Sequence, residues 1–418
     1  MIKPPPLRND CFALPPGVTW TPVDEALDLL RARLHTVVSA TSGPLNAALG
    51  RVLAEDAIAV RSNPPHPNSA VDGYGFLGGI PDGETRIMPL CEGRAAAGVP
   101  FDGKVPQGSA LRILTGAPIP GGVDTVVLEE DVTREGNEIA LRGPLKQGAN
   151  TRKAGEDVRA GEVALKQGTK IGAPEIALLS AVGVQDVITF APLRVAIVST
   201  GDELVDAGQA AAPGQIGDAN RPMLSAIVKS WGYEVVDLGI QPDDPATIRA
   251  ALDRGAREAD VILTSGGASA GDEDHISALL RESGHMQSWR IAIKPGRPLA
   301  LALWNDVPVF GLPGNPVAAM VCTLVFARPA LASLSGMQWQ APQGFQVPAN
   351  FTKSKKPGRR EFLRARIRDG AVDVFKSEGS GRISGLAWAD GLAELPDGAL
   401  EVQPGARVTY YPWGSFGL

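Results

Sequence analysis

Short apolar runs alternate with helical patterns from about residue 191 to residue 335, and this alternation constrains the fold more than any other feature. Strands that alternate with helices in this way indicate βαβ units and a parallel sheet. Such strands are buried on both faces, so they need not alternate polar and apolar residues. We therefore predict an α/β domain over residues 191–335. The expected strands cover residues 194–199, 234–238, 261–264, 291–293 and 307–311, and the expected helices cover residues 221–231, 245–258 and about 274–282.

The flanking segments predict further domains, because 418 residues are too many for one ordinary core. Residues 1–20 form a proline-rich lead-in that we expect to be flexible. Residues 21–190 combine a helical linker portion with a β-rich domain at about 86–189, where short β-type runs alternate with Gly and Pro turns. Residues 343–418 are β-like and predict a small barrel. The fold class expected is therefore multidomain α/β plus β.

Composition limits the possible partners and compartment. The net charge is −6 and aromatic residues make up 5% of the chain, which argues against a nucleic-acid binder. The basic run 353–360 is the one stretch that favours such binding, and such runs are more often solvated loops. No apolar run approaches the roughly 20 residues of a membrane helix. The three cysteines, Cys11, Cys91 and Cys322, have no metal or disulfide spacing, which indicates a reducing compartment. Together, these features predict a cytoplasmic protein with no membrane or nucleic-acid partner.

Glycines and acids follow each expected strand of the α/β domain. Ligands of open parallel sheets bind at the carboxyl ends of the strands, so these loops are expected to share one rim. Backbone N–H groups of glycine loops suit an anion, acids suit Mg²⁺, and Lys294 and Arg297 add positive charge. Together they predict a phosphate ester bound through Mg²⁺, although turns favour Gly and Asp anyway. Asp243 or Asp244 is also expected to cap the helix from Pro245. The acids of the rim are Asp202, Glu203, Asp244, Asp272 and Asp274.

The sequence Gly267–Gly271 also fits G-x-S-x-G, the nucleophile motif of α/β hydrolases. That fold requires a histidine from a much later loop, whereas the histidines after Ser269 are His275 and His285, both close to it. The acids beside the motif would also oppose an oxyanion hole. We therefore expect Ser269 to donate a hydrogen bond to a bound anion. The P-loop, dinucleotide-binding and H-E-x-x-H motifs are absent from the sequence.

Two polar stretches stand out nearer the N-terminus. Asn68–Tyr74 places an amide, an acid and a hydroxyl in a turn, and Arg152–Asp157 places two cations before two acids. Each could be an ordinary turn. With the rim loops, however, they form an ordered set that resembles the molybdopterin molybdenumtransferases, the MoeA family, which is called the gephyrin E domain in animals. The segments that carry the resemblance are NSAVDGYG (68–75), RKAGEDVRAGE (152–162), STGDEL (199–204), TSGGASAGDED (264–274), AIKPGRP (292–298) and GLPGNPVA (311–318).

The resemblance implies a fold and an activity. It implies an adenylyltransferase-like molybdopterin-binding α/β domain, β-rich N-terminal domains and a C-terminal β-barrel. It implies insertion of molybdate into adenylylated molybdopterin with Mg²⁺, with release of AMP and molybdenum cofactor. It further implies a homodimer whose cleft joins the sheet domain of one subunit to the N-terminal motifs of the other. Transient contacts with a molybdopterin adenylyltransferase and with molybdoenzyme acceptors are expected as well.

The rim residues and the resemblance together assign the site. Pro67 stands where the family usually has an acid, and Arg290 and Arg297 stand where lysines are common, which changes a point charge into a planar fork. We predict catalytic roles for Asp72, Asp157, Glu203, Asp244 and Lys294. We predict substrate binding by Ser69, Arg152, Gly266, Gly267, Ser269, Arg290, Arg297, Pro313 and Ser380. We predict metal binding by Asp272, Asp274 and Glu203.

Two other interpretations stay open. One is an enzyme that resembles the molybdopterin adenylyltransferases, which share the sheet domain. The additional N-terminal and C-terminal domains argue against it, and an ATP-binding assay would separate the two. The other is a non-catalytic scaffold, against which the acids retained in the rim loops argue.

Overall fold

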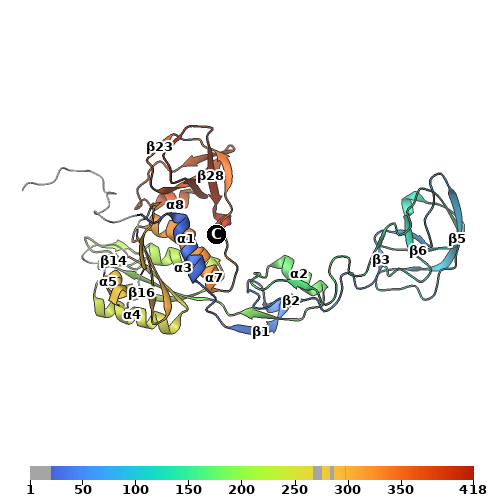
Figure 1. Cartoon of the computed structure of the whole chain (residues 1–418), viewed down its shortest axis with the longest axis horizontal. Helices are drawn as coiled ribbons and strands as arrows, with labels where there is room; N and C mark the ends of the chain where they lie inside the picture. Colours follow the sequence, from blue (N-terminus) through green and yellow to red (C-terminus); the bar gives the residue numbers. More distant parts are fainter. Residues whose placement is uncertain (1–19, 267–274, 283–286, 297) are drawn as a thin grey trace, which may run out of the picture. The chain divides into compact units, whose positions relative to one another are not determined.

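The computed structural model divides the chain into two compact units (Figure 1). Unit 1 comprises Met1–Thr41 and Phe190–Leu418, and unit 2 comprises Ser42–Thr189. The residues that the structure describes are 20–266, 275–282, 287–296 and 298–418, without the side chains of 287–290 and 298.

The centre of unit 1 is a six-stranded sheet with the order β16-β13-β17-β21-β20-β18. The first four strands are parallel, as predicted. In contrast, β20 runs antiparallel to both of its neighbours, so the sheet is mixed. The strands are β13 (Arg194–Thr200), β16 (Glu234–Gln241), β17 (Val261–Ser265), β18 (Gln287–Arg290), β20 (Pro298–Trp304) and β21 (Val307–Leu312).

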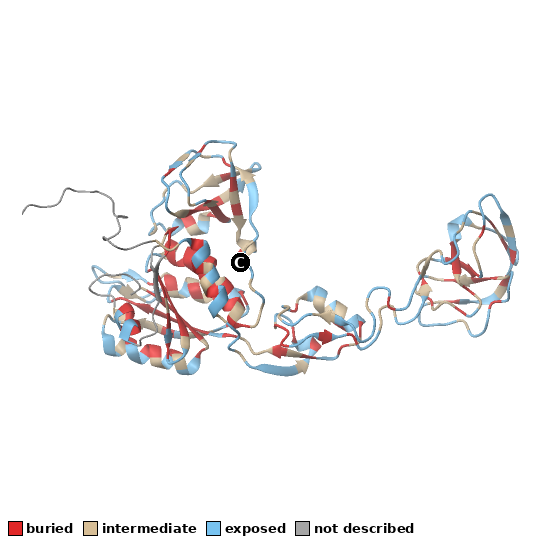
Figure 2. Ribbon diagram, in the orientation of Figure 1, coloured by how far each residue is buried: buried red, intermediate tan, exposed pale blue. Residues whose placement is uncertain are grey.

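Helices cover both faces of this sheet. Val195 and Ile197 of β13 belong to one core with helices α1 (Val23–Arg33) and α3 (Asn220–Ser230). The alternate residues Ala196 and Val198 belong to a second core with α4 (Pro245–Glu258) and α5 (His275–Glu282). Figure 2 shows these central strands as largely buried. Burial on both faces explains why their sequences are apolar throughout.

One long helix lies in the core of unit 1. It consists of α6 (Pro316–Cys322), the π-helical segment η3 (Thr323–Ala327) and α7 (Arg328–Leu334). This helix of 19 residues contains an 18-residue stretch with a mean hydropathy of 1.8, so by length and composition it could cross a membrane. However, 83% of that stretch is buried inside the protein. The sequence expectation that no apolar run approaches membrane length is therefore wrong. Burial identifies the segment as a core helix.

The C-terminal part of unit 1 is the predicted β-barrel. Its strands follow the order β22-β28-β26-β24, and β25 pairs with β24. A bridge between Ala349 and Val372, with the N–H of Asn350 donating to the carbonyl of Val372 at 2.8 Å, closes β25 onto the end of β22. Asp369 and Gly370 have φ of 50° and 76° at the turn from β24 to β25, as a tight hairpin requires. The strands are β22 (Phe345–Pro348), β23 (Lys353–Lys355), β24 (Arg360–Arg368), β25 (Ala371–Val374), β26 (Gly391–Leu395), β27 (Leu400–Val402) and β28 (Arg407–Pro412), with α8 (Ser384–Trp388) and η4 (Trp413–Phe416).

The expectation that Ile291–Ile293 forms a strand of the α/β sheet is wrong. Strand β18 pairs with β20 in the α/β sheet, whereas β19 (Ile293–Lys294) pairs with β24 of the barrel. Ile291 and Ile293 are each 1% exposed, in a core that also contains Phe362 of the barrel. The apolar pattern therefore reflects burial between the sheet domain and the barrel.

Unit 2 contains a six-stranded sheet with the order β7-β4-β6-β5-β9-β8. This sheet begins at β4, upstream of residue 86. A second core gathers around Leu53, Ile171 and Leu179, next to α2 (Ala173–Ala181). The strands are β2 (Ala57–Ile58), β3 (Asn68–Ser69), β4 (Gly73–Phe76), β5 (Thr85–Ala95), β6 (Ala110–Ile113), β7 (Thr125–Leu128), β8 (Thr133–Glu135), β9 (Glu138–Arg142), β10 (Thr151–Arg152) and β11 (Val163–Leu165), with η1 (Leu45–Ala47) and η2 (Glu129–Asp131). Strands β1 (Ala40–Pro44) and β12 (Asp186–Phe190) contain the unit boundaries, and β14 (Leu204–Val205) and β15 (Ile216–Gly217) belong to unit 1.

Candidate functional site

The pairing of β3 with β10 brings the two N-terminal motifs of unit 2 together. Ser69 lies opposite Thr151, and Asn68 lies opposite Arg152. Ser69 is fully buried, and its hydroxyl donates to the carbonyl of Val71 at 2.6 Å, so in this conformation the side chain shapes the turn. The guanidinium of Arg152 is exposed and has no hydrogen-bond or ion-pair partner within the part of the chain that the structure describes. Of these two predicted substrate-binding residues, Arg152 is the accessible one.

Asp72 is held in place by a residue that the sequence analysis missed. The N–H and the hydroxyl of Thr115 both donate to Oδ1 of Asp72, at 2.7 and 2.6 Å. These two hydrogen bonds lower the pKa of Asp72 below its ordinary value. Because Asp72 is exposed and ionised at neutral pH, it can accept hydrogen bonds or coordinate a cation, but it cannot act as a proton donor. No spacing in the sequence links Thr115 to Asp72.

Asp157 lies in a tight turn that packs on the segment before the first motif. Its Oδ2 accepts a hydrogen bond from Nδ2 of Asn63 at 2.8 Å, and the N–H of Gly155 donates to the carbonyl of Pro64 at 2.9 Å. Gly155 has a φ of +65°, and a Cβ there would lie 2.9 Å from Cγ of Arg159. The turn therefore requires glycine, and it leaves the carboxylate of Asp157 exposed.

In unit 1, the loops after β13 and β16 lie side by side, as the shared rim predicts. The N–H of Asp243 donates to Oδ1 of Asp202 at 3.0 Å, and the N–H of Asp202 donates to Oδ2 of Asp243 at 3.3 Å. Glu203 is exposed next to them. Gly201 has a φ of +147°, which residues with a side chain rarely adopt, so this loop favours glycine as well. The predicted rim thus presents exposed carboxylates.

Asp244 serves as the N-cap of α4. Its Oδ2 accepts hydrogen bonds from the N–H and the hydroxyl of Thr247, at 2.8 and 2.7 Å, and these lower its pKa. A carboxylate at this position stabilises the helix start, because it satisfies a backbone N–H that has no partner within the helix. Oδ2 of Asp244 therefore has a structural role in capping the helix, independent of any ligand.

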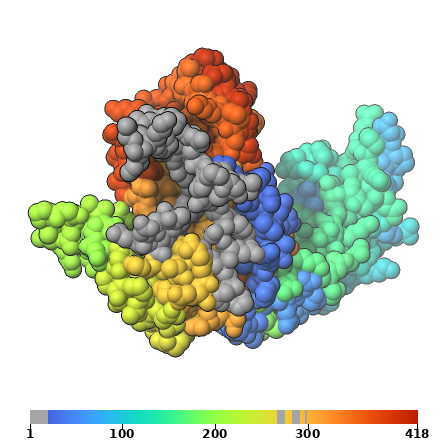
Figure 3. Space-filling model, turned by 60° about the vertical axis from the view of Figure 1, so that its left-hand side comes forward, coloured from blue at the N-terminus to red at the C-terminus, as the bar shows by residue number. Residues whose placement is uncertain are grey.

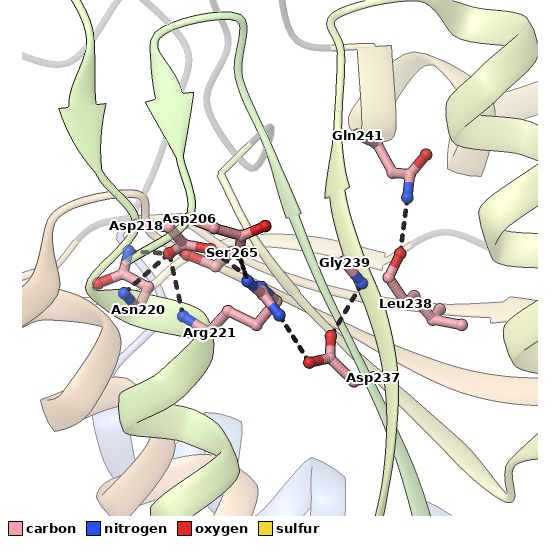
Figure 4. A network of polar contacts seen from close by, with 9 residues as sticks. All are labelled: Asp206, Asp218, Asn220, Arg221, Asp237, Leu238, Gly239, Gln241 and Ser265. Carbon is pink, nitrogen blue, oxygen red and sulfur yellow. Dashed lines mark hydrogen bonds and ion pairs between the residues drawn. The ribbon is translucent and has the colours of Figure 1, made fainter. Parts of the chain in front are cut away.

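Beneath the rim lies a buried polar floor. Nδ2 of Asn220, at the start of α3, donates to Oγ of Ser265 at 2.7 Å (Figure 4). It also donates to the carbonyl of Gly314 at 2.6 Å. A Cβ on Gly266, whose φ is +91°, would lie 2.8 Å from the carbonyl of Thr200. Pro313 is buried next to Gly314. Three side-chain oxygens of this floor are buried without a partner among the described residues: Oγ of Ser199, Oγ1 of Thr264 and Oδ1 of Asn220.

The third part of the site is a cavity of about 250 Å³ between the sheet domain and the barrel, lined in part by Lys294, Lys353 and Glu378. Nζ of Lys294 lies 2.6 Å from Oε2 of Glu378 and 3.4 Å from both carboxylate oxygens of Glu361. Nζ of Lys353 lies 3.1 Å from Oε2 of Glu361 and also pairs with Glu378. The carbonyl of Ser380 accepts a hydrogen bond at 3.2 Å from the N–H of Val317. Two cations and two acids therefore neutralise each other beside this cavity.

The basic run 353–360 is engaged within unit 1. Nζ of Lys355 donates to the carbonyl of Gly398 at 2.8 Å. The guanidinium of Arg360 pairs with Asp24 of α1 at 2.7 Å and with Asp397 at 3.0 Å. These contacts tie the barrel to the first helix, and they give this run a structural role.

Replacing Glu378 by glutamine is expected to lower the melting temperature at neutral pH but not in acid. Burial opposes ionisation of Glu378, yet the hydrogen bonds from Lys294 and Lys353 outweigh it and hold its pKa below the ordinary 4.5. Its stabilising contribution is therefore complete above the unfolded-state pKa, and it is lost as pH falls through the lowered folded-state pKa. Thermal melts of both proteins from about pH 7 to about pH 3 measure this gap. A gap that does not change with pH would contradict the expectation, and Glu282→Gln, in an exposed ion pair, is the control.

The donor chemistry of the rim suits a hard cation such as Mg²⁺, because its groups are carboxylates. Of the three predicted metal ligands, the structure describes only Glu203. The described residues alone contain no group of three or more His, Cys, Asp or Glu placed to hold a metal ion. Arg290 lies at the carboxyl end of β18, with its side chain not described. The predicted site residues outside the described ones are Gly267, Ser269, Asp272, Asp274 and Arg297.

Comparisons with known proteins cover nearly the whole chain. Family models match three regions: the MoeA N-terminal region (domain I and II) at residues 21–183, a probable molybdopterin binding domain at 196–333, and the MoeA C-terminal region (domain IV) at 346–413. The molybdopterin molybdenumtransferase of Haemophilus influenzae is 38% identical over 376 residues, which are 88% of this chain and 93% of the relative. Molybdopterin molybdenumtransferase 2 of Mycobacterium tuberculosis is 34% identical over 385 residues, which are 87% and 93%.

Solved structures agree with the sequence relatives. A crystal structure of a molybdopterin biosynthesis MoeA protein from Pyrococcus horikoshii OT3 has a TM-score of 0.80 at 28% identity, and the match covers 94% of this chain and 100% of that chain. A second structure of a Pyrococcus horikoshii MoeA protein has a TM-score of 0.74 at 29% identity. The fold, the three matched regions and relatives at 34–38% identity show that the chain belongs to the MoeA family.

Proposed function

We propose that this protein acts in molybdenum cofactor biosynthesis as a molybdopterin molybdenumtransferase, which inserts molybdate into adenylylated molybdopterin and releases AMP. The observation that carries the proposal is the carboxyl rim of the sheet. There, the half-buried Gly266 lies against the carbonyl of Thr200 and the exposed Gly314 lies next to Gly266, near the loop that carries the exposed carboxylates of Asp202 and Glu203. Backbone N–H groups suit the phosphates of the substrate, and the acids suit the cation that would accompany them.

The residues of the chain contribute mainly positioning and electrostatics. Glu203, with Asp272 and Asp274, would hold Mg²⁺, which supplies charge neutralisation at the phosphoanhydride when it is bound. The N–H groups of the glycine loops orient the adenylyl phosphate, so that water can attack the anhydride and AMP can leave. The chain forms no covalent intermediate in this proposal.

Lys294 is proposed to draw in molybdate, a tetrahedral dianion. The carboxylate of Glu378 that Lys294 contacts is 48% exposed, so an oxyanion can displace it from the lysine without opening the core. Lys353, which is 12% exposed, would remain to share the added negative charge. Arg152 and Arg290 are further candidates for the same attraction.

We further propose a homodimer in which Asp72, Asp157 and Arg152 of one subunit complete the rim of the other. Unit 2 carries these N-terminal motifs and unit 1 carries the rim, so the two sets of residues come from different compact units of the chain. Contacts with an adenylyltransferase that supplies the substrate and with molybdoenzymes that accept the product would be transient. We propose a cytoplasmic location, without a membrane or nucleic-acid partner.

The test is release of AMP from adenylylated molybdopterin by the purified full-length protein. We expect release that requires both molybdate and Mg²⁺ and that stops when the Mg²⁺ is chelated. A folded protein that releases no AMP under these conditions would eliminate the transferase. ATP binding with transfer of AMP to molybdopterin would then favour the adenylyltransferase-like enzyme, and binding of neither nucleotide would favour the scaffold.

A further inference from the structure

Arg221, in the first turn of α3, joins three segments of unit 1 that are separate in the sequence (Figure 4). Its guanidinium pairs with Asp206, which follows β14, and with Asp218, which follows β15, with Nε 3.2 Å from Oδ2 of Asp218. It also lies 2.6 Å from Oδ2 of Asp237 in β16. One side chain therefore clamps both ends of an excursion of the chain and fastens them to the sheet. None of the sequence motifs predicts a role for Arg221.

The excursion is the segment 201–219, which leaves the sheet at the end of β13 and carries Glu203. All of residues 206–217 are described and none is buried, so no apolar core holds them (light green at the left of Figure 3). Two backbone hydrogen bonds join its outgoing and returning halves: the N–H of Ile216 donates to the carbonyl of Glu203 at 2.7 Å, and the N–H of Asp218 donates to the carbonyl of Val205 at 2.8 Å. The position of Glu203 therefore depends on polar contacts.

The other end of the clamp acts on the neighbouring rim loop. Oδ1 of Asp237 accepts a hydrogen bond at 2.9 Å from the N–H of Gly239, where β16 is irregular and φ is +75°. Two residues later, the carbonyl of Gln241 accepts the N–H of Gly201 at 3.1 Å. Arg221 is therefore connected to the loop of Glu203 in two ways: directly through Asp206, and through Asp237 and the end of β16.

The chemistry of this cluster requires an arginine. Three carboxylates surround one cation, and the side chain of Asp218 is only 2% exposed. Burial acts to lower the pKa of Arg221, but the three carboxylates outweigh it and raise the pKa overall. A planar guanidinium can meet three acceptors at once, whereas a lysine presents one ammonium group. Without the cation, three acids would repel one another at the base of the excursion.

We infer that Arg221 is a positioning residue, which holds Glu203 in place at the rim by clamping segment 201–219 to β16. The effect on catalysis rests on the proposed function, because it requires that Glu203 takes part in the reaction. The effect on the segment does not, and the two are therefore tested separately.

Amide hydrogen exchange of the full-length protein tests the clamp without any substrate. We expect Arg221→Gln to raise exchange at Ile216 and Asp218 by about tenfold or more, with core amides of β17 unchanged. Arg221→Lys should fall between this variant and the unaltered protein. The control is Arg254→Gln, which removes an exposed ion pair on α4. Unchanged exchange at both amides overturns the proposal. If Arg221→Gln does not fold, Asp206→Asn and Arg221→Lys carry the same test with smaller expected shifts.

A double-mutant cycle then tests whether Arg221 acts through Glu203. We expect Arg221→Gln to lower kcat by about tenfold or more with KM changed less, as misplacement of an acting group does. If Arg221 acts through Glu203, adding Arg221→Gln to Glu203→Gln lowers kcat little further. Losses that multiply would overturn the action through Glu203. An unaltered protein that releases no AMP would refute the proposed function, while hydrogen exchange still decides the clamp.

Discussion

Replacing Asp72 by asparagine is expected to lower the rate of molybdate-dependent AMP release by about a hundredfold or more. Both hydrogen bonds from Thr115 hold the carboxylate in its ionised form, and asparagine keeps the shape while it removes the charge. Because Asp72 is exposed, the substitution should leave the melting temperature within a few degrees of the original. Single-turnover measurement of AMP release at saturating molybdate gives the rate of the chemical step.

The same variant can locate the site relative to the subunits. Lys294→Met is expected to inactivate the half of the proposed site that unit 1 carries, and Asp72→Asn the half that unit 2 carries. If the site joins two subunits, mixing the two inactive proteins under conditions of subunit exchange restores activity, because one site of each mixed dimer is intact. Activity that stays absent in mixtures shown to have exchanged would place both halves in one subunit. Full activity of Asp72→Asn alone would remove Asp72 from the reaction.

Replacing Gly73 by alanine, one residue further along, is expected to destabilise unit 2 by about 3 kcal/mol or more. Gly73 begins β4, which lies between β7 and β6 in the sheet. A Cβ at this position would lie 1.7 Å from the carbonyl oxygen of Val127 and 3.2 Å from Cα of Leu128. These are backbone atoms of the paired strand, so the clash can be relieved only if β4 and β7 separate. Urea denaturation, monitored with a probe in unit 2, measures the loss in the free energy of unfolding.

Gly43→Ala is the matched control for this prediction. Gly43 also lies in unit 2, and a Cβ there would meet nothing within 4 Å. We expect the control to stay within about 0.5 kcal/mol of the original protein. Equal stability of the two variants would show that the strands accommodate the side chain. Gly73 in the Asn68–Gly75 motif would then require a functional explanation, since packing would not explain it.

The central strands and the cap of α4 could be predicted because their signals are local. An apolar run identifies a buried strand, and an acid before Pro245 identifies a helix start, and both were confirmed. The prediction of a sheet strand at Ile291–Ile293 was wrong, because burial against the barrel produces the same apolar pattern as burial in the sheet. The single-sequence pattern cannot distinguish the two surfaces.

The contacts that hold the candidate site could not be predicted, because they join residues far apart in the chain. Thr115 meets Asp72 across 43 positions, and Asn220 meets Gly314 across 94. Each is a common polar residue in an unremarkable stretch, and only the folded sheet brings the partners together. The roles of the predicted site residues in catalysis stay predictions, including those of Gly267 to Asp274.

The division of the chain has a consequence for the order in which the protein folds during synthesis. Unit 2 is one continuous segment, Ser42–Thr189, so all of its residues leave the ribosome before most of unit 1 is made. Helix α1 is made first, yet Val23, Ala26 and Leu30 pack in a core with residues from Leu193 onward. Its apolar face therefore stays uncovered while about 160 further residues are translated, which at typical rates takes on the order of ten seconds. Chaperones that bind nascent chains would have α1 as an early target, and its docking would be a late step in folding.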